Sequence, residues 1–113
     1  MERLVIKVID IKGKCPIYKI GDKIIIEGPE VKLDETDALC IHAFASLLPY
    51  IIAFRKGVKP SEIGLGDEKK AYVHCPDPGP PYTPGGTVTF EITVVRDEAE
   101  KGLENSEGGH RGS

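Results

Sequence analysis

The sequence predicts an α+β fold in which one long, buried and kinked helix packs on a mostly antiparallel sheet. Short runs rich in β-branched residues lie on both sides of one long apolar segment, residues 38–56. Turns rich in Gly and Pro separate these runs. We therefore expect the order β-β-α-β-β in a single domain, 1–96, followed by an acidic, Gly-rich and flexible tail, 97–113.

The first expected strand, 3–11, is apolar on both faces, which is typical of a strand in the middle of a sheet. One face would carry Leu4, Ile6 and Val8, and the other Val5, Ile9 and Ile11. Further strands are expected at 23–27, 71–75 and 87–96. The last of these alternates clearly and should point four side chains inward: Val88, Phe90, Ile92 and Val94.

The helix is expected over 38–56, with Thr36 or Asp37 capping its first amides. The segment is apolar almost all round, so the helix should be heavily buried. Pro49 removes an amide donor, which predicts either a kink or two consecutive short helices. Gly57 is the expected residue that ends the helix.

The charge distribution argues against two classes of partner. The chain has 113 residues and a net charge of −3, and the tail holds all of that excess. A neutral body without a basic run predicts no binding to nucleic acid or to anionic membranes. The chain also has no apolar stretch long enough to span a bilayer. The remaining partners are a small-molecule ligand of unknown class and a second copy of the chain in a homo-oligomer.

The cysteine count and the composition predict a cytoplasmic protein. Three cysteines are an odd number, which argues against the disulfide framework of a secreted domain. The N-terminus also lacks the apolar core of a signal peptide. Gln is absent and Asn105 is the only Asn, whereas Lys and Glu are abundant. This composition is typical of proteins from a thermophile.

Cys15, Cys40 and Cys75 each lie where an expected strand or helix meets a loop. Functional groups often lie at such places, and thiolates bind zinc and iron–sulfur clusters. The sequence therefore predicts that these three cysteines bind zinc or an iron–sulfur cluster. The alternative is that they are small buried side chains, since free cysteine is among the most buried residue types. No Cys-x-x-Cys pair occurs, so the spacing differs from that of zinc ribbons and ferredoxins.

His42 and Asp77 are the candidate auxiliary metal ligands. His42 follows Cys40 by two residues, so in a regular helix the two side chains point about 200° apart. They could share a metal only if the helix begins later, and a structural histidine is the alternative. Asp77 lies two residues after Cys75, between two prolines. It either lines a cleft with the cysteines or accepts hydrogen bonds within a turn.

Taken together, four short motifs resemble an uncharacterised prokaryotic family of small three-cysteine domains. The resemblance covers residues 3–96 and implies that the three cysteines belong to one shared site, without implying a function. In that family a Gly-His pair often follows the first Cys-Pro, whereas this chain has Ile17 and Tyr18 there. The motifs are GKCP at 13–16, KIGD at 19–22, CIHAF at 40–44 and CPDP at 75–78.

Three functions remain open at this point. The first is a domain that binds a metal or cluster and serves redox or sulfur chemistry. The second is a non-catalytic interaction module, able to self-associate, with structural cysteines and a contact surface at the Pro-rich loop 76–86 and Tyr82. The third is an enzyme whose nucleophile is Cys40, activated by the N-terminus of the helix. Motifs of the common nucleotide-binding and hydrolase classes are absent from the sequence.

Overall fold

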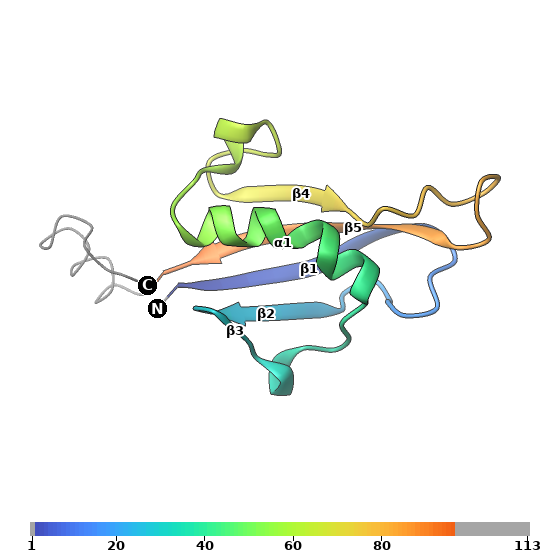
Figure 1. Ribbon diagram of the computed structural model, residues 1–113, viewed down its shortest axis with the longest axis horizontal. Helices are drawn as coiled ribbons and strands as arrows, with labels where there is room; N and C mark the ends of the chain where they lie inside the picture. The colour runs from blue at the N-terminus through green and yellow to red at the C-terminus, as the bar shows by residue number, and fades with distance from the viewer. Residues whose placement is uncertain (1, 97–113) are drawn as a thin grey trace, which may run out of the picture.

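The sheet is built around strands from opposite ends of the described chain. A computed structural model describes residues 2–96 of the protein, so the expected tail lies outside the described residues. β1 (Arg3–Gly13) lies between β2 (Lys23–Glu27) and β5 (Gly86–Val95), and β3 (Glu30–Val31) and β4 (Lys70–His74) form the edges (Figure 1). All four pairings are antiparallel. The predicted α+β class is confirmed.

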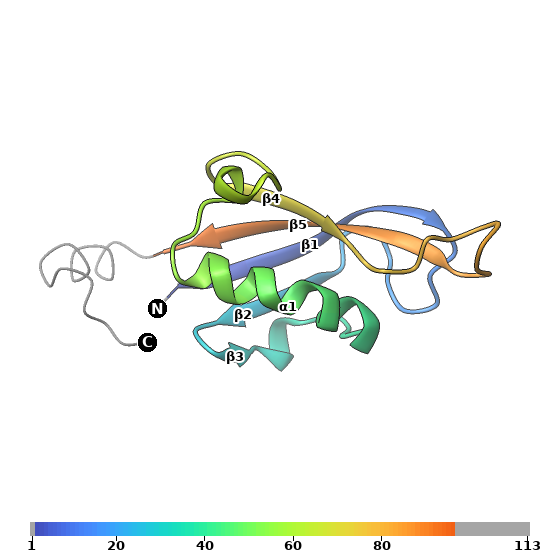
Figure 2. The same cartoon turned by 45° about the horizontal axis from the view of Figure 1, so that its top comes forward.

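The helix α1 (Ile41–Arg55) covers one face of this sheet (Figures 1 and 2). Short 3₁₀ turns precede and follow it, η1 (Leu33–Glu35) and η2 (Pro60–Ile63). No helix within residues 2–96 is long and apolar enough to cross a membrane. The side chains that α1 turns toward the sheet are Ala43, Leu47, Ile51 and Phe54.

The core lies between α1 and the covered face of the sheet. The predicted alternation of β5 is confirmed at Val88, Phe90 and Ile92, which are buried, whereas Val94 is half-buried. In β1 the buried side chains are Leu4, Ile6 and Val8. The same holds for β4, where Ala71 and Val73 are buried. Burial of this much branched aliphatic surface is the main stabilising contribution to such a fold. The central residues of the core are Leu4, Ile6, Val8, Val88, Phe90 and Ile92.

Because of a bulge in β1, the predicted orientation of Ile11 is wrong. The register with β5 shifts between Val8 and Asp10, so Ile9 has no direct partner. One extra residue moves every later side chain of a strand to the other face. Ile11 consequently pairs with Val88 and packs against the core, whereas strict alternation placed it on the opposite face.

The predicted order β-β-α-β-β lacks one element. The expected strand 23–27 ends as predicted, but Gly28 and Pro29 after it form a tight turn into the unexpected strand β3. Gly28 has a φ of +57°, a conformation that favours glycine. The turn lets Glu30 pair with Glu27 at the edge of the sheet. A strand of two residues carries too short a pattern to be recognised from sequence.

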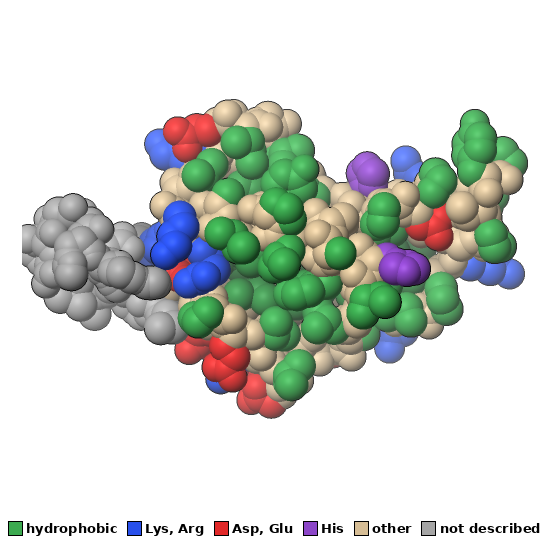
Figure 3. All heavy atoms as spheres, viewed as in Figure 1, with side chains coloured by type: hydrophobic (Ala, Val, Ile, Leu, Met, Phe, Trp, Pro, Cys, Tyr) green, Lys and Arg blue, Asp and Glu red, His purple; other side chains and the backbone are tan. Residues whose placement is uncertain are grey.

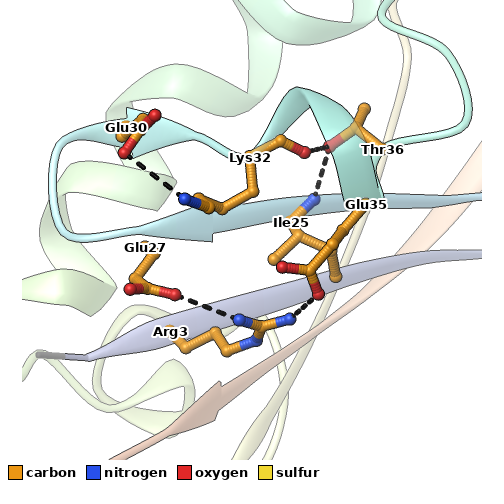
Figure 4. A network of polar contacts seen from close by, with 7 residues as sticks. All are labelled: Arg3, Ile25, Glu27, Glu30, Lys32, Glu35 and Thr36. Atoms are coloured by element: carbon orange, nitrogen blue, oxygen red, sulfur yellow. Dashed lines mark hydrogen bonds and ion pairs between the residues drawn. The ribbon is translucent and has the colours of Figure 1, made fainter.

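Thr36 and Asp37 do not cap α1, contrary to the prediction. The Thr36 hydroxyl accepts a hydrogen bond from the Ile25 amide at 3.0 Å and donates one to the Lys32 carbonyl at 2.8 Å (Figure 4). The Asp37 carboxylate accepts a bond from the Lys23 amide at 2.8 Å. Both side chains therefore satisfy amides of β2. The helix begins later, at Ile41, with Cys40 as its N-cap residue.

Arg3 holds this segment against the sheet. Its guanidinium contacts Glu27 of β2 at 3.0 Å and also Glu35 of η1 (Figure 4). One side chain thus joins β1, β2 and η1. Together with the Thr36 bonds, this contact fixes the path along which the chain leaves β3 and approaches α1.

Pro49 lies inside one continuous helix. The alternative of two short helices is therefore wrong, and the expected kink is not confirmed. Pro49 is on the exposed side of α1. The carbonyl that loses its amide partner, four residues earlier, consequently also faces solvent, where water can replace the missing bond. Gly57, with a φ of +97°, follows the end of the helix as predicted.

Candidate functional site

The three cysteines lie near one end of the core. Cys15 is in the loop after β1, Cys40 is the N-cap residue of α1, and Cys75 directly follows β4. Cys75 is only 7% exposed, whereas Cys15 and Cys40 are half-buried. All three pack against the same hydrophobic core cluster. They differ, however, in what surrounds each sulfur.

The sulfur of Cys75 is held by the backbone of β5. It accepts a hydrogen bond from the Val88 amide at 3.3 Å and donates one to the Gly86 carbonyl at 3.6 Å. The Cys75 amide also donates to the Val88 carbonyl at 2.9 Å. A buried thiol with both a donor and an acceptor behaves as a structural side chain. This environment agrees with the interpretation of Cys75 as a small buried side chain rather than as a metal ligand.

The sulfur of Cys15 instead accepts hydrogen bonds from two backbone amides. The backbone N–H groups of Ile17 and Tyr18 point at it, at 3.4 and 3.3 Å. Amides that point at a sulfur stabilise negative charge there, as they do in metal–thiolate sites. The residue also lines a shallow, open hollow between the loop after β1 and the loop before β5. The other residues of this hollow are Ile11, Gly13, Lys14, Pro16, Pro84 and Gly85.

Tyr18 connects Cys15 to Cys40, and the sequence analysis did not identify it. Its hydroxyl oxygen accepts the Cys40 amide at 2.9 Å, and its ring packs edge-on against Phe90, with centroids 5.5 Å apart. The side chain is 4% exposed. Burial raises the pKa of Tyr18, and the nearby Cys40, Cys15 and Asp22 raise it further, against the lowering effect of the Cys40 amide. The phenol is therefore protonated at neutral pH.

Asp77 organises its own loop. Its carboxylate accepts bonds from the Gly79 amide at 2.9 Å and from the Thr83 hydroxyl, and its carbonyl accepts the Thr87 hydroxyl at 2.7 Å. The bonds from Thr83 and Gly79 lower the pKa of Asp77, burial raises it, and the charge of nearby His42 lowers it. The turn interpretation accounts for these contacts. His42 itself is exposed near the start of α1.

The predicted metal ligands are not gathered around one point. Among residues 2–96, no three His, Cys, Asp or Glu side chains are arranged so that they could hold a metal ion. In the same part of the chain, the Cys40 sulfur has no hydrogen-bond partner that could serve as a general base. The described residues therefore form no ready-made three-ligand site and no Cys40–base pair, and the metal site and the Cys40 enzyme both stay predictions.

The outward face of α1 carries a group of exposed apolar side chains. Ile41 is 78% exposed, Ile52 49% and Leu48 39%, and Ala45 and Pro49 lie exposed between them. The spacing 41-45-48-52 places these residues on one side of a helix. Hydrophobic side chains gather along α1 in the space-filling view (Figure 3). We refer to these five residues as the α1 outer face.

Comparison of the chain with models of known families, with curated proteins and with solved structures gave no match. The resemblance to the family of small three-cysteine domains therefore stays a prediction. Function has to be inferred from the chemistry of the described residues.

Proposed function

We propose that this protein is a non-catalytic interaction domain that self-associates through the α1 outer face. The observation that carries the proposal is the composition of this face. From Ile41 to Phe54, α1 contains no Asp, Glu, Lys or Arg, although a helix on the surface of a monomer normally carries charge on its solvent side. Contiguous apolar patches of this kind mark interaction sites.

The charges at the two ends of α1 favour a second copy of the same chain. Arg55 and Lys56 lie at the C-terminal end of the helix, with Arg96 beside Arg55. Near the N-terminal end lies the carboxylate of Asp77. Glu2 pairs with Arg55 and Arg96 and offsets one of their two charges. In an antiparallel pair related by a two-fold axis, this end of each helix, which also carries Lys56, meets the end of the other helix near Asp77. Such complementarity fixes the orientation of two apolar faces that would otherwise slide.

The segment after residue 96 is a less suitable partner for the α1 outer face than a second copy of the chain. It contains five acids, and its only large apolar residue is Leu103. A sequence of this composition buries little apolar surface. The α1 outer face of a second copy, in contrast, is apolar from Ile41 to Ile52, a rise of about 17 Å along the helix.

Replacing Ile52 with glutamate should dissociate the dimer. In a two-fold interface the substitution enters twice, so it places two carboxylates in the apolar contact, and we expect the dissociation constant to rise about a hundred-fold. Sedimentation equilibrium over a range of protein concentrations measures this change. Leu33→Glu is the matched control, because Leu33 is 74% exposed on η1 and lies away from the α1 outer face. A wild-type protein that stays monomeric at high concentration would rule out self-association.

Metal or cluster binding is the second candidate function. The observation that favours it is the pair of amides on the Cys15 sulfur, together with a second half-buried thiol, Cys40, linked to the same loop through Tyr18. We infer that Cys15 and Cys40 would supply thiolates, with Cys75, His42 and Asp77 as the further predicted ligands. Zinc or an iron–sulfur cluster fits such donors. Three free cysteines also fit a reducing, cytoplasmic environment.

The metal and inorganic sulfide content of anaerobically purified protein tests this candidate. If the metal site exists, we expect near-stoichiometric metal that falls to background in Cys15→Ser and in Cys40→Ser. The same measurement on Cys75→Ser separates a ligand from a structural thiol, since Cys75 is already hydrogen-bonded to β5. Metal-free wild-type protein, also after anaerobic supplementation with iron and zinc, would contradict the candidate.

A further inference from the structure

An open hollow lies at the end of the molecule where α1 and β5 both finish (Figure 1). Its lining comes from these two ends, from the connection to η2 and from the residues just before β4. The floor is apolar and only partly covered, since Phe54 is 1% exposed but Val95 is 47% exposed. Contiguous apolar surface with a polar rim is typical of an interaction site. The apolar lining residues are Phe54, Val58, Pro60, Val94 and Val95.

The rim of this hollow is basic. Its charged residues are three bases and one acid: Lys59, Lys69, Arg96 and Glu68. Lys59 and Glu68 form a pair at 3.2 Å, and Glu2, 3.9 Å from Arg96, offsets part of the charge of that arginine. The Lys69 ammonium, in contrast, has no carboxylate partner within residues 2–96. The rim therefore attracts an acidic occupant.

The chain that continues beyond β5 begins at this rim. Arg96 is a lining residue and also the last described residue, so residue 97 starts beside the hollow. The sequence of 97–104 is DEAEKGLE, with four acids, one base and a single large apolar residue, Leu103. Seven extended residues span up to about 24 Å, which allows Leu103 to fold back onto the floor. The segment thus complements the hollow in charge and in its one large apolar side chain.

We propose that residues 97–104 bind in this hollow, with Leu103 on the apolar floor and acidic side chains beside Lys69. Because the segment is tethered at Arg96, its effective concentration at the hollow is on the order of millimolar. A separate acidic peptide would have to exceed that concentration to displace it. The hollow shares no residue with the α1 outer face, so the proposal does not depend on self-association.

Methyl NMR of the full-length protein, ¹³C-labelled on Leu and Val, tests the proposal. We expect nuclear Overhauser effects between the methyl groups of Leu103 and those of Val58 or Val95. They should weaken in about 1 M NaCl, where the Debye length is about 3 Å. Lys69→Glu should lower the ratio of bound to unbound segment about five-fold, because a repulsion between exposed charges replaces an attraction. The position of the Leu103 methyl resonance relative to its random-coil value measures this ratio.

Lys12→Glu is the matched control, since Lys12 is also exposed but pairs with Thr87 at the opposite end of β5. It should leave the Leu103 resonance at its wild-type position. The absence of contacts between Leu103 and these valines at low salt, or a Lys69→Glu spectrum equal to that of the wild type, would overturn the proposal. Contacts found only between labelled and unlabelled chains would also overturn it, because the hollow would then hold the segment of a second copy. The contacts should persist in Ile52→Glu, which separates this result from the test of self-association.

Discussion

Phe90→Ala is expected to lower the free energy of unfolding by about 3–5 kcal/mol, the range for removing a fully buried aromatic ring. Phe90 is 0% exposed and lies on the covered face of β5, paired with Val8 of β1 and Val73 of β4. The ring also packs against the edge of Tyr18. The substitution therefore leaves a cavity where the central strands meet the loop that carries the candidate site.

Urea unfolding followed by far-UV circular dichroism measures this loss. A domain of this size typically has only about 5–15 kcal/mol of stability, so the variant should unfold at a much lower urea concentration. Thr89→Ala is the matched control on the adjacent position, which faces the uncovered side of the sheet, and it should change stability by less than about 1 kcal/mol. Equal effects of the two substitutions would show that β5 does not face the core as described.

Glu2→Gln is expected to cost about 2 kcal/mol at pH 7, because it removes the charge from a hydrogen bond between ionised groups. The Glu2 carboxylate accepts the Arg55 Nε–H at 2.8 Å and lies 3.9 Å from the Arg96 guanidinium. These side chains are 13–17% exposed, so water screens them poorly. Arg96 also donates to the Arg55 carbonyl at 3.1 Å. The cluster joins the start of β1 to the ends of α1 and β5.

The same cluster predicts the pH dependence of stability. Burial alone would raise the pKa of Glu2, but the hydrogen bond from Arg55 and the charges of Arg55 and Arg96 bring it below its ordinary value of 4.5. A carboxyl with a lowered folded pKa contributes its full stability above the unfolded pKa and loses it as the pH falls through the folded pKa. The difference between wild type and Glu2→Gln should therefore be complete at neutral pH and shrink below about pH 4.5.

Unfolding curves recorded from pH 7 to pH 3 test this dependence. Glu30→Gln is the control, since Glu30 is 67% exposed, lies 3.7 Å from Lys32 and should contribute almost nothing at any pH. A difference between wild type and Glu2→Gln that is constant across this range would show that the carboxylate charge does not stabilise the fold.

The strands and the helix could be predicted because their patterns are long. Ten residues of alternating side chains identify β5, and fifteen nearly uncharged residues identify α1. The bulge at Ile9 could not be predicted, since β1 is apolar on both faces and a one-residue shift leaves such a pattern unchanged. The start of α1 was misplaced for a different reason. Thr36 and Asp37 are good caps, but amides of β2, distant in sequence, compete for them.

The candidate site depends even more on contacts between distant residues. The sequence identified Cys15 and Cys40 through their positions at the ends of elements, but nothing in the spacing connects them. Tyr18 makes that connection through one hydrogen bond to an amide 22 residues away. The only local signal for Tyr18 was that it is the single aromatic residue in the loop after β1.

The central position of β1 and β5 has a consequence for biosynthesis. These neighbours come from the two ends of the described chain, so their pairing closes almost the longest loop available in it. Contacts between such distant segments slow folding, because the chain entropy must be lost before the contacts form. On the ribosome, β1 emerges first and can pair with β2 on one side only. The core is completed only after β5 has left the exit tunnel and paired with β1.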